Sequence, residues 1–168
     1  MTGRTLLSER GLTLVEVLLA VAVVGLAVAG VGVVVPVSSY GVQDGNQLSA
    51  ATFLAEQMVE RARAATWTVE PAVDCLGASV GDTEPVPTGA TCLGVTTTQF
   101  PDETAGVRGA PQYRRTVRIS RCETGACAGM NAIGLRLVEV TVDYTPLSTG
   151  SVAGGVRTVQ LAWLASQK

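Results

Sequence analysis

GLTLVEVLLAVAVVGLAVAGVGVVV, residues 11–35, is the stretch that decides the fold. Its one charged side chain is Glu16, and the short head before it carries Arg4 and Arg10. A helix over residues 12–35 rises about 1.5 Å per residue and reaches roughly 36 Å, which is enough to cross the hydrocarbon core of a bilayer. We therefore expect one membrane-spanning helix near the N-terminus.

Glu16 is unfavourable in this stretch, because a carboxylate inside a membrane helix costs about 2.5–3.5 kcal/mol to insert. Cleavage after Gly11 would create a cationic amine at Leu12, four residues before the acid. A charge pair in a low-dielectric helix bundle is favoured over either charge alone, and setting register is the best-attested use of buried polar groups. Glu16 is therefore predicted to align stacked helices by pairing with a terminal amine.

The residues from Gly11 to Glu16, followed by the apolar run, resemble the N-terminal signature of type IV prepilins and type II secretion pseudopilins, G-F-T-L-x-E, with Leu12 in place of the usual Phe. The resemblance implies cleavage after Gly11 by a prepilin peptidase and N-methylation of Leu12. It also implies that Glu16 meets the terminal amine of a neighbouring subunit. Residues 51–63, ATFLAEQMVERAR, look like the corresponding helix of V-type minor pilins and I-type pseudopilins.

The same resemblance implies the α+β pilin fold. In that fold a long N-terminal helix has a membrane-spanning first half and an amphipathic second half, which packs on a C-terminal antiparallel sheet of three to four strands. The expected divisions are a cleaved leader (1–11), a transmembrane assembly helix (12–36), an amphipathic helix (37–66) and a globular head (67–168). Pro36 lacks the backbone N–H of a helical residue, so we expect a kink there.

As a structural subunit of a pilus or pseudopilus, the chain is expected to have no enzymatic activity and no cofactor. The resemblance implies as partners a prepilin peptidase, other pilins and minor pilins, an inner-membrane platform protein and an assembly ATPase. It places the chain in the bacterial inner membrane as a single-pass protein, and then in a filament at the cell surface. Arg4 and Arg10 agree with a cytoplasmic N-terminus and a periplasmic head, because positive charge beside an apolar segment is retained in the cytoplasm.

The rest of the chain has the patterns of a helix followed by a sheet. Apolar residues three and four apart predict an amphipathic helix over residues 47–65, with the face Leu48, Ala51, Ala55, Met58, Ala62 and Ala65. Alternation over residues 113–120, 135–144 and 158–165 predicts an antiparallel meander whose apolar face lies on that helix. Residues 67–102 are rich in Pro, Gly and Thr, which indicates an irregular connection, with one strand at residues 95–99.

Four cysteines lie in the exported part, where oxidation is permitted. Three pairings are open, and the spacing favours Cys75 with Cys92 and Cys122 with Cys127. Neither pair has the C-x-x-C spacing of a zinc site, and the chain contains no His to complete a mixed one. We therefore expect two local disulfides and no metal.

The absence of His also removes the commonest general base, so no catalytic residue is predicted. The formal net charge of −2 does not indicate nucleic-acid binding, which usually shows a basic domain. One basic cluster is nevertheless present. In a strand Arg114 and Arg118 share one face, and Arg115 and Arg121 share the other. DNA contact by Arg114 and Arg118 is one interpretation, and pairing of the arginines with the acidic residues of segment 70–103 is the other.

Two alternatives to the filament interpretation stay open. The apolar stretch can be an uncleaved anchor whose Glu16 lies near the membrane interface. It can also be a secretory signal peptide cut after Ala29, because Ala27, Val28 and Ala29 fit the small-residue cleavage pattern. Either alternative would make the chain an exported ligand-binding or adhesive domain.

Overall fold

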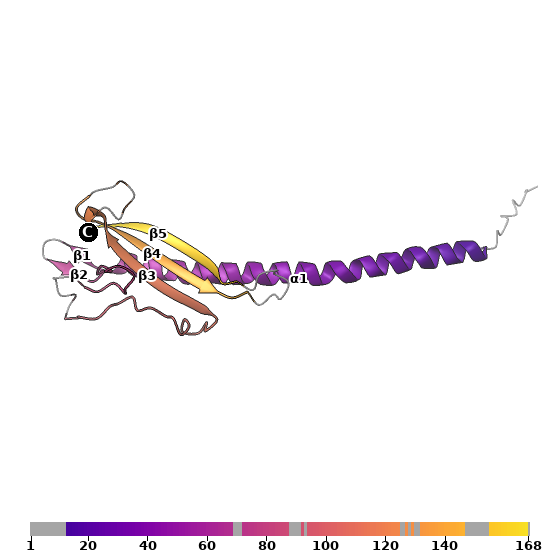
Figure 1. The fold of residues 1–168 in the computed structure, drawn as a ribbon, viewed down its shortest axis with the longest axis horizontal. Helices are drawn as coiled ribbons and strands as arrows, with labels where there is room; N and C mark the ends of the chain where they lie inside the picture. Colours follow the sequence, from indigo (N-terminus) through magenta and orange to yellow (C-terminus); the bar gives the residue numbers. More distant parts are fainter. Residues whose placement is uncertain are drawn as a thin grey trace, which may run out of the picture. The chain divides into compact units, whose positions relative to one another are not determined.

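A computed structural model describes residues 13–68, 72–87, 92, 94–124, 127, 129, 132–146 and 155–167. Its elements are α1 (Leu14–Ala64), β1 (Trp67–Thr68), β2 (Val73–Asp74), β3 (Tyr113–Arg121), the short 3-10 helix η1 (Cys122–Thr124), β4 (Leu135–Tyr144) and β5 (Arg157–Ser166), labelled in Figure 1. The predicted α+β class is confirmed. The chain divides into two compact units, Met1–Val42 and Gln43–Lys168, and each is described by itself.

The N-terminal unit is helical from Leu14 onward. Thr13 caps the helix, because its Oγ1 accepts a hydrogen bond from the Glu16 N–H (3.4 Å) and its carbonyl accepts bonds from the N–H groups of Glu16 (3.0 Å) and Val17 (3.2 Å). Leu14–Gly32 is long and apolar enough to cross a membrane, and none of it is buried. This confirms the prediction of an apolar helix that could span a membrane, although a signal sequence passes the same test.

α1 continues as a helix through Pro36, so the chain does not unwind at this residue. A proline removes only one N–H from the hydrogen-bond ladder, which is compatible with a helix that continues past it. A bend at Pro36 stays a prediction.

In the second unit, residues 43–64 of α1 lie against the sheet. Ala51, Ala55, Met58 and Ala62 are buried as predicted, and Val59 joins them. The prediction for Leu48 is wrong, because 48% of this side chain is exposed while Gln47 is buried. Positions 47, 51, 55, 58 and 62 follow one another at spacings of three and four, so the buried stripe passes through Gln47. The Gln47 carbonyl also accepts a hydrogen bond from the Tyr113 hydroxyl (3.3 Å).

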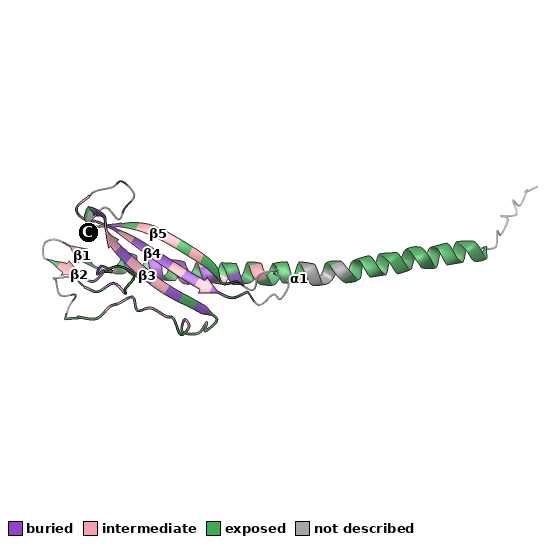
Figure 2. Ribbon diagram, viewed as in Figure 1, coloured by how far each residue is buried: buried purple, intermediate pink, exposed green. Residues whose placement is uncertain are grey.

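The sheet is the predicted antiparallel meander, with strand order β3-β4-β5 (Figure 1). Val117 lies opposite Val140, and Val140 lies opposite Leu161. The face toward α1 forms the core with the alanines of the helix, and Figure 2 shows this alternation of buried and less buried positions along β3 and β4. The buried residues of this face include Tyr113, Val117, Ile119, Val138, Val140, Val142 and Tyr144.

The connection from α1 to β3 differs from the prediction in two places. β1 and β2 pair as a small antiparallel sheet where an irregular chain was expected. No strand forms at residues 95–99, and Val95 makes only an isolated bridge to Cys92. Gly94 between them has φ +83°, a left-handed conformation that turns the chain back on itself and so prevents an extended strand. Both disulfides favoured by the spacing, Cys75–Cys92 and Cys122–Cys127, are present.

Candidate functional site

The first candidate site is the exposed surface of Leu14–Gly32. Large apolar side chains cover it on all sides, with Leu14 76% exposed and Leu26 75% exposed. In Figure 2 the ribbon of this stretch has the colour of exposed residues throughout. Removing apolar surface from water is worth about 25 cal/mol per Å², so a helix that is uncovered all round is unfavourable in water. The described part of the chain does not cover this surface.

Glu16 lies in the first turn of this helix and is exposed. A carboxylate near a helix N-terminus is stabilised by the helix dipole, by about 0.3–1 kcal/mol at the surface. That is less than the cost of its insertion, and among the described residues no side chain pairs with the carboxylate. Glu16 is therefore an acid in an apolar surface, and no described side chain pairs with it.

Small residues interrupt the same surface. A Cβ added at Gly25, Gly30 or Gly32 would meet nothing within 4 Å, so these glycines do not serve packing against the described part of this chain. Small residues let membrane helices approach each other closely. Gly11 and Leu12, the predicted cleavage and methylation positions, lie outside the described residues.

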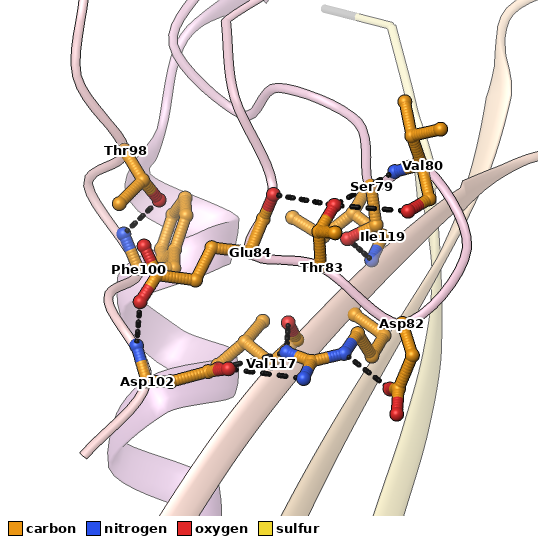
Figure 3. Close-up of polar contacts among 11 residues, drawn as sticks. Ser79, Val80, Asp82, Thr83, Glu84, Thr98, Phe100, Asp102, Val117 and Ile119 are labelled. Carbon is orange, nitrogen blue, oxygen red and sulfur yellow. Dashed lines mark hydrogen bonds and ion pairs between the residues drawn. The ribbon is translucent and has the colours of Figure 1, made fainter. Parts of the chain in front are cut away.

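The second candidate site was the basic pair Arg114 and Arg118. Arg114 is exposed, whereas Arg118 is held by two aspartates in the clamp drawn in Figure 3. Its Nε donates to Asp82 Oδ1 (2.8 Å), and its two terminal nitrogens donate to the Asp102 oxygens (2.7 and 3.0 Å). The hydrogen bond to Asp102 is the largest of the effects that raise the pKa of Arg118 above its usual value. Arg118 is thus occupied within the chain.

Arg115 is buried and also binds the acidic segment. Its Nε donates to Glu103 (2.7 Å), and a terminal nitrogen donates to the Leu54 carbonyl of α1 (2.8 Å). Arg115 and Arg118 of β3 therefore fasten the acidic connection to the sheet, as the second interpretation expects for these two residues. The cluster is not gathered into one patch for nucleic acid.

A third clamp, at Arg136, was not predicted. This buried guanidinium donates to both oxygens of Asp74 (2.6 and 2.9 Å) and to the Gly77 carbonyl (2.7 Å), and it lies 4.2 Å from the Trp67 ring. The one available signal was an arginine on the otherwise apolar face of β4. This clamp ties the start of the connection to the sheet.

Among the described residues no group of three His, Cys, Asp or Glu side chains could hold a metal ion. Comparison of the chain with protein-family models, with curated proteins and with solved structures found no match. The function is therefore inferred from the molecule's own surfaces.

Proposed function

We propose that this chain is a minor pilin or pseudopilin, a non-enzymatic structural subunit of a type IV pilus or a type II secretion-like filament. The observation that carries the proposal is the exposed apolar helix Leu14–Gly32, which contains one acid, Glu16, in its first turn. The Gly11–Glu16 motif supports it, because it resembles the prepilin signature.

The acid favours a filament subunit over a simple anchor. An anchor needs only apolar residues, and Glu16 makes insertion less favourable. In a bundle of such helices the acid gains a partner if each chain begins with a free amine at Leu12. The exposed glycines suit such a bundle, because they permit close approach.

The head supports the pilin fold as part of the same proposal. Residues 43–64 of α1 pack on a three-stranded antiparallel sheet, an arrangement that the pilin resemblance implies. Two disulfides suit a periplasmic location. A prepilin peptidase, other pilins, a platform protein and an assembly ATPase would be the partners.

The experiment measures how much of the chain enters sheared filaments, relative to the amount in the membrane. Glu16→Ala is expected to lower this ratio by at least about tenfold, which corresponds to roughly 1.4 kcal/mol of lost pairing. Val17→Ala is the matched control, because it shortens an exposed neighbour without touching the acid. Normal entry of Glu16→Ala into filaments would contradict the proposal.

A second candidate is an exported binding domain behind an ordinary signal peptide or anchor. It is favoured by the same apolar helix, which could equally be a signal sequence. Glu16→Ala would then leave export of the head unchanged or improve it.

A further inference from the structure

The two edge strands of the three-stranded sheet, β3 and β5, differ in how many of their outward backbone groups are hydrogen-bonded. The outer edge of β3 is covered by the connection before it. Arg115 exchanges both backbone hydrogen bonds with Glu103 (2.9 and 3.4 Å), and Ile119 bonds Ser79 through its carbonyl (2.8 Å) and its N–H (3.1 Å). The Val117 carbonyl accepts a bond from the Arg118 guanidinium (2.8 Å). Figure 3 shows the part of this cover around Ile119 and Val117.

The described residues do not cover the outer edge of β5 in this way. The backbone N–H and C=O groups of Arg115 and Ile119 point away from β4. Because these directions alternate along each strand of an antiparallel sheet, the register of the three strands fixes which backbone groups of β5 point away from β4. These are the N–H and C=O groups of Thr158, Gln160, Ala162 and Leu164. No described residue bonds these backbone groups.

The exposed edge also lacks the features that normally discourage pairing. Proteins protect free edges with charged side chains, proline, bulges or short strands. The segment TVQLAWLAS at residues 158–166 has no charge, no proline and no glycine, and β5 runs in unbroken register with β4. Such a strand is a template for another strand.

A groove of about 340 Å³ lies beside this edge. Leu161 and Trp163 of β5, with Val59 of α1, give it apolar lining, and Glu56 and Glu60 of α1 give it acidic lining. Glu60 pairs with Arg63 (2.6 Å), whose guanidinium lies 5.2 Å from the Trp163 ring. Glu56 is exposed, and no other described side chain pairs with it. The groove thus carries an uncompensated negative charge.

The negative charge of the groove indicates which kind of strand can pair with β5. Antiparallel pairing of two copies through β5 would place α1 of both copies on the same face of the joined sheet, and would bring Glu56 and Glu60 of one copy toward those of the other. Like charges placed opposite each other are destabilising. An incoming strand with a cation avoids this.

We propose that β5 accepts an extended segment of another polypeptide as a fourth strand, with alternate apolar side chains in the groove and a Lys or Arg beside Glu56. Main-chain hydrogen bonds to the β5 edge would give affinity, and the groove would give specificity, as in other cases of strand addition. This inference is independent of the proposed filament function.

The test uses the full chain in detergent micelles and the heptapeptide TVTKTVT, whose valines and lysine share one face. Binding is expected to slow exchange of the amide hydrogens of Thr158, Gln160, Ala162 and Leu164 by at least about tenfold and to leave those of β3 unchanged. Glu56→Lys should weaken binding several-fold and should favour the matching peptide TVTETVT.

Ala162→Pro removes one outward-facing N–H, which an edge strand tolerates, and should weaken binding by about tenfold or more. Ala162→Thr keeps the N–H and is the matched control. If Ala162→Pro does not fold, the same peptide N-methylated at its second and third threonines makes the equivalent test on the unaltered chain.

Four results would overturn the proposal. The first is equal binding by Ala162→Pro and Ala162→Thr, or by the methylated and unmethylated peptides. The second is the absence of binding at millimolar peptide. The third is protection of the β5 edge amides without peptide at every dilution, which would mean that the chain covers its own edge. The fourth is peptide-free protection that rises with protein concentration, which would mean that a second copy occupies the edge.

Discussion

The two stretches of α1, Leu14–Gly32 and residues 47–62, belong to one helix and have opposite relations to their surroundings. In the first, the described side chains are exposed and apolar on every side. In the second, one face is buried against the sheet and the other carries Glu56, Glu60 and Arg63 in water. An apolar face needs only a sheet to cover it, whereas a helix that is apolar all round needs a non-aqueous environment. The head therefore supplies its own core, and the first stretch depends on molecules outside the chain.

The comparison predicts that the largest stability losses come from buried groups of the head. Arg136→Ala removes the guanidinium that neutralises the buried Asp74 carboxylate, so we expect the free energy of unfolding of the head to fall by about 3–5 kcal/mol. Chemical denaturation of the full chain in micelles, followed by Trp67 fluorescence, measures it. Arg121→Ala is the control, since this half-exposed arginine lies 3.7 Å from Glu123 and should cost less than about 1 kcal/mol. Equal stability losses in Arg136→Ala and Arg121→Ala would contradict the prediction.

The disulfide that closes the longer loop is predicted to contribute more to the stability of the head. Replacing Cys75 and Cys92 by Ser opens a loop of sequence separation 17 and should cost about 3 kcal/mol by chain entropy. Replacing Cys122 and Cys127 opens a loop of separation 5 and should cost about 2 kcal/mol. Denaturation midpoints of the two double variants check the order, and a reversed order would show that native contacts outweigh loop entropy.

A matched pair of substitutions compares the two stretches directly. Ala55→Leu inserts bulk into the core of the head and should cost about 1–3 kcal/mol. Gly25→Leu adds bulk where nothing lies within 4 Å, so the head should keep its stability while entry into filaments falls. Denaturation and the filament-to-membrane ratio measure the two effects. A stability loss from Gly25→Leu would mean that this stretch packs on its own chain.

The smallest expected effect is a loss of stability at alkaline pH. Burial raises the pKa of Tyr113 above its ordinary value of 10.0. Its contribution to stability is therefore complete below pH 10.0 and is lost as the pH rises through the higher pKa of the folded state. Tyr113→Phe removes this titration together with the hydrogen bond to Gln47, so it should show less alkaline weakening from a starting stability about 1 kcal/mol lower. An unchanged pH profile in Tyr113→Phe would contradict it.

Sequence patterns predicted the parts of the fold that local periodicity controls. The alternation in β3, β4 and β5 correctly placed even the buried Arg115, because strand period decides the face regardless of residue type. The patterns failed where distant contacts decide. Gln47 rather than Leu48 lies in the buried stripe and accepts a bond from Tyr113, and Val95 bridges only Cys92 where a strand was expected. The Arg136–Asp74 clamp joins residues far apart in sequence, which no local pattern could pair.

The acid of the candidate site was visible in the sequence, because a single Glu in an apolar run is unusual whatever surrounds it. Glu16 is exposed on the described helix, and its role in subunit register stays a prediction. The partner amine and the cleavage at Gly11 stay predictions, since they depend on another protein's action.

The most direct measurement is the mass of the N-terminal peptide of the mature chain, recovered from the membrane of cells that carry a prepilin peptidase. We predict a free or N-methylated amine at Leu12, which supplies the cation for Glu16. A chain that begins at Gly30, or one that keeps Met1, would contradict the account, because Glu16 would then be removed with a signal peptide or left without an amine beside it.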